Sequence, residues 1–533
     1  MLKPASLTLL VAAAQGFGQA SPFEPADFNV TEALLAQGFD PGAIPVVPET
    51  ARRDVSAGCQ AACKSLRQVY GADLLTSEEP AYDAFTGSYW AAQQVEVSPA
   101  CVLKAPDATA VSVAVLISRL TQCPFAARSG GHSHFPASAI EGGITISFEK
   151  MKDVTLADDR KTVHIQPGNV WGEVFDKLAD TELTVVGGRI YPVGTGGLTL
   201  GGGLSFFSGL YGLACDNIAK YTVVTAMGAI VEATPTQYPD LYWALRGGTN
   251  NFGLVVEFEA MAHPLPANQM WGGTRVFQEN QFPGLLDAYV HWVNNAPDDT
   301  NIGGWLAWIY RDGVMMASTE TYSAKPVADP PLFDGYKNLT AIQDTTKVRT
   351  VHEYARTLNA TAPYGLREMY EGITVKVDHD LLQAASDIYF EEVTALKDIE
   401  GFAPNLITQP LSVPMMSHMS RNGGNPLGLD PANGPLAIVQ TATMWNNAKD
   451  DATIEAYSNR VISRITAEAK SRGLDSDYIY LNYASKYQDV FAGYGKENLD
   501  KMRSISKKYD PAQVFQTLQP LYFKLNGGAP VKE

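Results

Sequence analysis

The sequence predicts a protein of the α+β class built from two domains. Its 533 residues exceed what one ordinary hydrophobic core accommodates, so at least two domains are expected. Short strands and glycine-rich turns precede Pro264-Leu265-Pro266, and longer helical windows alternate with strands from Gln269 to about Asp475. Strands and helices mixed in this second region indicate an antiparallel sheet covered by helices. We therefore place a domain boundary at residues 264–266.

The composition is typical of a well-packed globular protein. Hydrophobic residues make up 45% of the chain and charged residues 18%. The net charge of −17 and the pI of about 5.0 argue against a nucleic-acid partner or an anionic membrane surface. No basic stripe with interleaved aromatic residues offsets that balance.

The N-terminus, residues 1–20, has the pattern of a secretory signal peptide. Lys3 supplies the positive start, Leu7 to Ala14 the apolar run, and Gly18-Gln19-Ala20 a small-residue cleavage site. The apolar run is too short to span a bilayer, and a buried helix is the alternative. We expect a secreted protein, and three sequons that can accept N-glycans agree with this: Asn29, Asn338 and Asn359.

Cysteine usage fits the same oxidising compartment. Cys59, Cys63, Cys101 and Cys123 lie in the N-terminal quarter, and Cys215 stands apart. Cys59 and Cys63 are spaced like half of a metal site. No second His or Cys pair with zinc-ligand spacing follows them, so no metal site is expected. We expect two disulfides among the first four cysteines, in an unspecified pairing, and a buried thiol at Cys215.

Local patterns predict the elements in order. Residues 21–96 form a lead-in with a helix at Ala57–Tyr70. Asp107 can cap a helix that runs to Thr121, with a further helix at Val170–Thr181. Strands are expected at Gln94–Val97, Cys101–Ala105, Phe125–Arg128, Gly143–Phe148, Thr162–Gly168, Tyr221–Val231 and Gly253–Glu259, those at 143–148 and 162–168 half-buried. After the boundary, helices are expected at Phe282–Asn295, Leu381–Leu396 and Ala452–Arg472, and strands at Thr274–Phe277 and Gly303–Trp308.

Two glycine-rich segments carry the strongest functional pattern. The first is Arg128-Ser129-Gly130-Gly131-His132-Ser133, and the second runs from Gly194 to Gly203. Glycine tolerates positive φ and lets backbone N–H groups approach an anion closely. The pattern indicates a large diphosphate cofactor with His132 as the reactive side chain. It is not the Rossmann fingerprint, because Thr199 stands where a third glycine is needed, and no Walker lysine is present.

These segments, with four other motifs, resemble one family. The motifs are Pro99-Ala100-Cys101, Leu241 to Gly248, Asn251-Phe252-Gly253-Leu254-Val255 and Tyr480-Leu481-Asn482-Tyr483. Together they resemble the vanillyl-alcohol oxidase/p-cresol methylhydroxylase flavoproteins, and within them the berberine bridge enzyme-like FAD-linked oxidases of the fungal, secreted type. The resemblance covers roughly residues 59–525. It implies a PCMH-type FAD-binding domain (97–266, completed by 476–533) around a substrate domain (267–475).

The resemblance also implies the cofactor and its contacts. In such enzymes the histidine of the first glycine turn, here His132, is bonded to the flavin, and a hydrogen-bonded turn histidine is the alternative. Ile190 stands where relatives have a second linking cysteine, so a single link is expected. The residues implied to contact FAD are Arg128, Ser129, Gly130, Gly131, His132, Ser133, Val193, Gly194, Gly196, Gly197, Gly202, Val256 and Asn482.

Val193 matches the position that controls oxygen access to the flavin in this family. A small β-branched side chain there leaves the approach open, and ordinary core packing is the alternative interpretation. Leu198 replaces a polar residue often present after the double glycine.

Tyr483 matches the family's catalytic base. A free phenol has a pKa near 10, so it needs a neighbouring group to take a proton at neutral pH, and the sequence does not identify that group. A buried tyrosine with a satisfied hydroxyl is the alternative. Relatives with a glutamate base draw it from the substrate domain, where Asp378, Asp380 and Glu391 are candidates.

Three further parts of the sequence are candidates for residues near the active site. His134 could line the cofactor site, although a surface or core role is favoured. The Arg421–Asn425 segment resembles a substrate-domain loop near the active site. A preceding group could shape an apolar pocket or simply pack in the core: Met415, Met416, His418 and Met419.

The expected function is that of a secreted FAD-dependent oxidase. The substrate, a small alcohol, phenol or secondary metabolite, would lose a hydride to flavin N5, and O₂ would be reduced to hydrogen peroxide. The alternatives are a sugar oxidase acting at the anomeric carbon, a flavin-binding protein without turnover, and a dehydrogenase that does not use oxygen.

Overall fold

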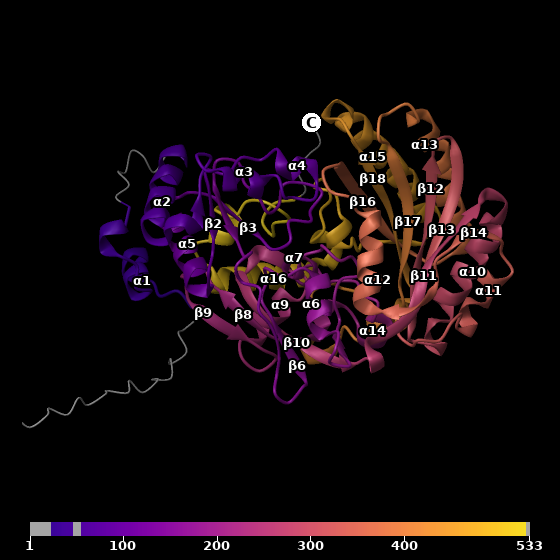
Figure 1. The fold of residues 1–533 in the computed structure, drawn as a ribbon, viewed down its shortest axis with the longest axis horizontal. Coiled ribbons are helices and arrows are strands. Elements are labelled where there is room, and N and C mark those ends of the chain that lie inside the picture. The colour runs from indigo at the N-terminus through magenta and orange to yellow at the C-terminus, as the bar shows by residue number, and fades with distance from the viewer. Residues whose placement is uncertain (1–22, 46–54, 529–533) are drawn as a thin grey trace, which may run out of the picture.

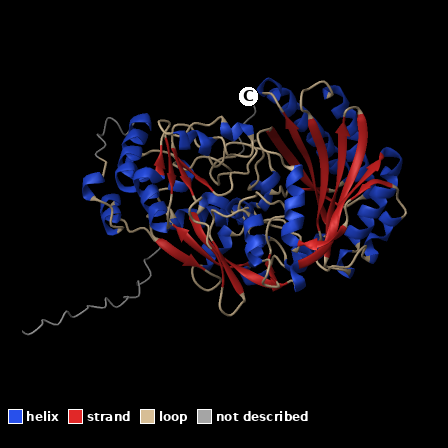
Figure 2. Cartoon of the chain, in the orientation of Figure 1, coloured by secondary structure: helices blue, strands red, loops and turns tan. Residues whose placement is uncertain are grey.

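Three β-sheets organise the protein, whose computed structural model describes residues 23–45 and 55–528 (Figures 1 and 2). The first sheet has the strand order β1-β2-β4-β3, in which β2, β4 and β3 run parallel. A helix, α5 (Ala108–Thr121), connects β2 to β3, and the Asp107 side chain caps it by accepting a hydrogen bond from the Ala110 N–H, as expected. The strands are β1 (Leu74–Leu75), β2 (Cys101–Lys104), β3 (Phe125–Arg128) and β4 (Ile144–Ser147).

Two disulfides join helix α2 (Val55–Tyr70) to this first sheet. Cys59 is bonded to Cys123, which follows α5, and Cys63 is bonded to Cys101 at the start of β2. Cys215 is a buried free thiol. The prediction of two disulfides among the first four cysteines and a lone buried thiol is confirmed.

The second sheet is antiparallel and centres on β10 (Leu254–Pro264). Its path is β5-β6-β10-β8-β9, and β7 also pairs with β10. The other strands are β5 (Val154–Leu156), β6 (Thr162–Ile165), β7 (Leu183–Val185), β8 (Ile218–Val224) and β9 (Ile230–Ala233). Helices α6 (Trp171–Leu178) and α7 (Thr195–Leu200) lie in the connections, so the second glycine-rich segment opens as a short helix.

The third sheet has nine strands and starts with β11 (Gln269–Gln278). Its path is β14-β11-β13-β12-β17-β18-β16-β19, with β15 also paired to β11. Helices α10 (Phe282–Asn294), α13 (His379–Val393) and α15 (Asp451–Arg472) pack on one face through a single apolar core. The antiparallel sheet covered by helices is confirmed. The remaining strands are β12 (Ile302–Arg311), β13 (Val314–Ser323), β14 (Ala341–Asp344), β15 (Lys347–Thr350), β16 (Arg367–Lys376), β17 (Ala403–Leu411), β18 (Leu436–Trp445) and β19 (Asp475–Ser476).

After β19 the chain returns to the first half of the molecule. Figure 1 shows this yellow segment lying among the purple N-terminal elements. Helix α16 (Lys496–Tyr509) packs against α9 (Pro239–Leu245), and the backbone N–H of Phe125 in β3 donates a hydrogen bond to the Leu518 carbonyl. The return brings residues 480–483 next to the second glycine-rich segment. The numerical division into domains stays a prediction.

Three local predictions were wrong. Residues 94–97 do not form a strand, because α4 (Ala92–Val95) turns there and Gln94 donates hydrogen bonds to the carbonyls of Gly131 and Ser133. The expected single strand 221–231 is two strands, β8 and β9, separated by a turn in which Gly228 has a positive φ of 77°. Strand β4 is buried on both faces rather than half-buried, because it lies between β2 and β3.

The predicted signal peptide lies outside the described residues. The side chains of Asn29, Asn338 and Asn359 are all exposed, so glycosylation at these positions stays a prediction. Within residues 23–45 and 55–528, no helix is long and apolar enough to cross a bilayer.

Removing one of the two disulfides should destabilise the protein measurably. Replacing both Cys63 and Cys101 by alanine frees β2 from α2 and is expected to lower the free energy of unfolding by about 2–4 kcal/mol. Chemical denaturation of protein made in an oxidising compartment measures this. Cys215→Ala, which breaks no cross-link, is the control and should cost less. Equal losses in the two variants would contradict the assignment.

Candidate active site

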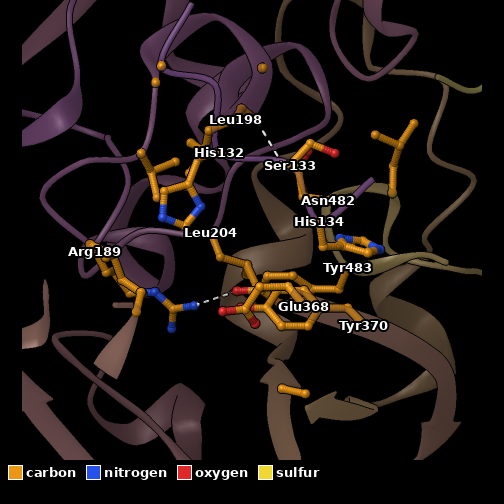
Figure 3. A pocket seen from close by; sticks show the side chains of 18 of the residues that line it. His132, Ser133, His134, Arg189, Leu198, Leu204, Glu368, Tyr370, Asn482 and Tyr483 are labelled. Atoms are coloured by element: carbon orange, nitrogen blue, oxygen red, sulfur yellow. Dashed lines mark hydrogen bonds between the residues drawn. The ribbon is translucent and has the colours of Figure 1, made fainter. Parts of the chain in front are cut away.

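A cavity of about 690 Å³ lies between the glycine-rich segments and the third sheet (Figure 3). One wall is formed by the turn after β3, residues 189–200 and residues 480–483 of the returning chain. The opposite wall is formed by side chains from β11, β12, β13, β16, β17 and β18. The volume is typical of a small-molecule site.

The two glycine-rich segments touch through their backbones. A Cβ added at Gly130 would lie 2.5 Å from the Gly194 nitrogen, and one added at Gly194 would lie 2.3 Å from the Gly130 nitrogen. Ser129 secures the contact, because its hydroxyl donates to the Pro167 carbonyl at 2.6 Å and accepts from the Gly196 N–H at 3.1 Å. Any side chain at either glycine would separate the segments.

His132 faces the cavity from the first segment. Its ring stacks on Trp90, with ring centroids 4.0 Å apart and an interplanar angle of 11°. Its Nε2 is buried without a hydrogen-bond partner among the described residues. Burial lowers the pKa of His132 to about 4, so the imidazole is neutral at pH 7 and its free nitrogen keeps a lone pair or a proton for a ligand.

The buried Arg189 and the half-buried Tyr483 form a pair on the same side of the cavity. The Arg189 Nη2 donates a hydrogen bond to the Tyr483 hydroxyl at 3.1 Å (Figure 3). It donates a second one to the Gln409 Oε1 at 2.6 Å. The guanidinium also lies over the Trp305 ring, 4.6 Å from its centroid. Arg189 is therefore the cation that contacts the Tyr483 hydroxyl, a neighbour that the sequence does not identify.

Asn482 holds the segment that carries Tyr483. Its side-chain amide donates to the Leu198 carbonyl at 3.1 Å and to the Tyr480 hydroxyl at 3.2 Å. The Tyr480 hydroxyl also accepts from the Leu204 N–H, so Tyr480 is engaged in structural contacts. Of the two tyrosines in residues 480–483, Tyr483 is the one whose hydroxyl accepts a hydrogen bond from Arg189.

Most of the predicted site residues line the cavity. These are Ser129, Gly130, Gly131, His132, Ser133, Val193, Gly194, Gly196, Gly197, Asn482 and Tyr483, together with Ile190 and Leu198. Arg128, Gly202 and Val256 do not. Arg128 donates to the carbonyls of Phe85 and Ser88, Gly202 packs beneath Tyr480, and Val256 lies in the core of the first sheet. The individual roles stay predictions.

The structure places His134 and the three acidic candidates differently from what the sequence suggests. His134, for which a surface or core role was favoured, is buried and lines the cavity, with its ring centroid 5.1 Å from that of Tyr370. The three acidic candidates, Asp378, Asp380 and Glu391, lie outside the cavity lining, and Asp378 instead caps α13.

The Arg421–Asn425 loop and the methionine group also lie outside the cavity lining. The fully buried Arg246 holds the loop by donating to the carbonyls of Arg421 and Gly424, and it forms an ion pair with Asp216. Met415, Met416 and Met419 are core residues, as the packing interpretation predicts.

Several polar residues of the third-sheet wall are not evident as site residues from the sequence. Glu368 and Tyr370 on β16, Gln409 on β17 and Gln440 on β18 all line the cavity. Their alternation along strands was the only sequence pattern that could have placed them on one face. Among the described residues, no group of three or more His, Cys, Asp or Glu side chains is arranged to hold a metal ion.

Comparisons with known proteins agree with this geometry. A sequence model described as an FAD binding domain matches residues 99–234. The FAD-dependent monooxygenase FUP4 of Fusarium proliferatum is 35% identical over 487 residues, covering 87% of this chain and 94% of FUP4. The bifunctional solanapyrone synthase of Alternaria solani is 33% identical, covering 80% and 82% of the two chains.

Solved structures share the fold. The BBE-like 1 protein of Physcomitrella patens superimposes with a TM-score of 0.72 at 19% identity, covering 88% of this chain and 99% of that one. The 6-hydroxy-D-nicotine oxidase of Arthrobacter nicotinovorans gives a TM-score of 0.70 at 21% identity, covering 84% and 96%. The chain belongs to the berberine bridge enzyme-like FAD-dependent oxidoreductases. Enzymes of this family act on small molecules.

The glycine side of the cavity fits the FAD that this family binds. A Cβ at Gly197 would meet no protein atom within 4 Å, so the backbone there is open to a ligand. The unpartnered Nε2 of His132 supplies a polar atom that only a ligand can satisfy. In this berberine bridge enzyme-like protein, residues 129–133 and 193–197 would therefore hold the cofactor, with Tyr483 and Arg189 on its substrate side.

Burial of His134 should make stability depend on pH. Burial, reinforced by the positive charge of Lys486, lowers the pKa of His134 to about 3, whereas the unfolded histidine titrates near 6.5. The unfolded chain therefore binds the extra proton below about pH 6.5, and the stability from the neutral imidazole, present above that pH, is lost as pH falls toward 3. The loss from pH 7 to pH 5 should be about 2 kcal/mol larger in the wild type than in His134→Gln.

Urea denaturation at the two pH values measures this difference. His291→Gln, at an exposed histidine, is the matched control and should follow the wild type. A wild-type curve that runs parallel to that of His134→Gln would show that the imidazole is not held neutral in the folded protein.

Proposed function

We propose that this enzyme is an oxidase that removes the elements of a hydride and a proton from a small alcohol, phenolic or secondary-metabolite substrate and reduces O₂ to hydrogen peroxide. The observation that carries the proposal is the hydrogen bond between Arg189 and Tyr483, 3.1 Å long, beside the cavity. It supplies a polarised phenol where the substrate must lie, between the glycine segments and the third sheet.

The roles of the protein groups follow from their contacts. When bound, FAD supplies the hydride acceptor and, once reduced, the electrons for O₂. Tyr483 acts as general base through its phenolate form and takes the O–H proton of the substrate. Arg189 stabilises the phenolate charge and is itself fixed by Gln409 and Trp305. Because Arg189 is buried, this electrostatic interaction is stronger than it would be in bulk water.

His132 is proposed as the single covalent attachment point of FAD. Its neutral imidazole, stacked on Trp90 and with a free buried Nε2, supports a nucleophilic role. Ile190, at the position of a second linking cysteine, packs in the same apolar cluster as Trp90 and carries no nucleophile. The covalent bond would raise the redox potential of the flavin and hold its ring.

Oxygen access is proposed to pass Val193. This side chain lines the cavity from the turn before Gly194 and is only partly buried, which supports a gating role over plain core packing. Peroxide formation is the expected outcome of that access.

A monooxygenase is the competing function, because similar fungal proteins such as FUP4 are named FAD-dependent monooxygenases. Peroxide yield and ¹⁸O₂ labelling separate the two on any substrate found by a screen over phenols, alcohols and sugars. An oxidase forms one H₂O₂ per O₂ consumed and leaves no label in the product. A monooxygenase forms water and incorporates the label. Turnover of oligosaccharides in the same screen would instead select the sugar-oxidase alternative.

We also propose that the protein is secreted. Detection of the protein in the culture medium tests this.

Removing the base or its partner should slow the reaction without losing FAD. Tyr483→Phe keeps the ring packing but deletes the proton acceptor, so kcat should fall about 10²–10⁴-fold. Arg189→Met removes the cation at the phenol oxygen and should also lower kcat, with Arg189→Lys falling less. Single-turnover reduction of the flavin, followed by its absorbance, measures the step directly.

Tyr364→Phe is the control, because this tyrosine is 49% exposed and does not line the cavity. If Tyr483→Phe reduces its flavin as fast as this control does, Tyr483 is not the base.

A further inference from the structure

Glu368 is a buried carboxylic acid on the substrate side of the cavity. It lies on β16, two residues before Tyr370, so both side chains leave the strand on the same face. Only 2% of its surface is exposed, and its Oε1 is buried without a hydrogen-bond partner among the described residues. Gln93 fixes the backbone of Glu368, donating to its carbonyl at 2.8 Å and accepting from its N–H at 3.2 Å.

Glu320, on the same cavity wall, is a buried glutamate whose two carboxyl oxygens both accept hydrogen bonds. Its Oε1 accepts from the Tyr354 hydroxyl and its Oε2 from the Thr274 hydroxyl. Both glutamates line the cavity and both are 98% buried, since each has 2% exposure. Of the two carboxyl groups on the described wall, only that of Glu368 lacks a protein partner.

No cation of the described cavity lining is paired with Glu368. The lining contains two arginines, Arg189 and Arg311, and Arg311 lies on β12, which β17 and β18 separate from β16. Arg189 is engaged by Tyr483 and Gln409, and no ion pair joins Glu368 to an arginine or lysine among the described residues. An ionised carboxylate in such a place is costly, so burial raises the pKa of Glu368 well above its usual range. The neutral acid has one O–H donor and keeps acceptor capacity.

The surroundings of Glu368 are flat and aromatic. The Tyr370 ring lies 6.1 Å from that of Tyr483 and 5.1 Å from that of His134, measured between centroids. Figure 3 shows Glu368, Tyr370 and Tyr483 grouped in the same part of the cavity, near the Arg189 hydrogen bond. A ligand that reaches the base therefore passes within reach of this acid.

We propose that Glu368 is a substrate-binding residue that, as a protonated acid, donates a hydrogen bond to a hydroxyl or carbonyl oxygen of an uncharged substrate. The inference rests on the proposed function, since it names the class of molecule that the same cavity takes. A carboxylate substrate would meet no cation next to this acid in the described lining, because Arg189 is engaged and Arg311 lies three strands away. An amine would require Glu368 to ionise, and no protein group is placed to stabilise that charge when the amine is absent.

The test measures equilibrium binding to the holoenzyme, without turnover. Benzyl alcohol, benzylamine and benzoate share a skeleton and are uncharged, cationic and anionic at pH 7.5, and calorimetry gives each affinity for the wild type, Glu368→Gln and Glu368→Leu. The wild type should bind benzyl alcohol more tightly than either ion. Glu368→Gln, which keeps a neutral donor, should stay within about threefold, and Glu368→Leu should lose at least about tenfold.

Thermal unfolding separates binding from structure. Glu368→Leu removes an unpartnered buried acid and should keep or raise the Tm, whereas the control Glu320→Leu strands the hydroxyls of Tyr354 and Thr274 and should lower it. A lower Tm in Glu368→Leu would mean a structural role and would overturn the proposal.

Four other results of the binding experiment would contradict the proposed role of Glu368. Tightest binding of benzylamine, an equal loss in Glu368→Gln and Glu368→Leu, unchanged affinity in Glu368→Leu, or no binding of any probe at 50 mM would each overturn it. If the binding pattern holds but no peroxide forms with any substrate, the oxidase function fails while the role of Glu368 stands.

Discussion

The close contact between Gly130 and Gly194 is the constraint on which the site depends. Each glycine occupies space that the other's Cβ would need, so the turn after β3 and the start of α7 approach at backbone distance. The contact fixes where His132 and Val193, their neighbours in sequence, face the cavity. The returning chain then closes against α7 through Asn482. Segments remote in sequence thus form one rigid wall.

Burial also determines which groups carry charge in the cavity, on both of its walls. Burial keeps the imidazoles of His132 and His134 neutral, and it disfavours ionisation of Glu368. Arg189 is a buried cation, and its contacts with Gln409 and Trp305 orient it toward the Tyr483 oxygen. The hydrogen bond between Arg189 and Tyr483 is therefore the contact on which the proposed role of Tyr483 as a base depends.

Structural features that depend on a short stretch of sequence could be predicted from the sequence. The glycine turns, the Asp107 cap, the long helices of the second half and the presence of two disulfides, although not their pairing, follow from local pattern and composition. The helix at residues 92–95 could not, because a hydrogen bond from Gln94 to the distant first glycine segment decides it. The same limit applies to the site: Arg189 and Tyr483 lie 294 residues apart, and nothing near either residue encodes the pairing. Glu368 was missed because only the completed sheet turns it toward the cavity.

The central claim is that the first glycine segment delivers His132 to the flavin. The most direct measurement is to denature the purified protein in acid, digest it and map the yellow peptide by mass spectrometry. The account predicts one flavin-modified peptide, with the modification on His132 and none on the peptide that contains Ile190. A colourless polypeptide with all of the cofactor released, or a flavin bonded to another residue, would contradict it.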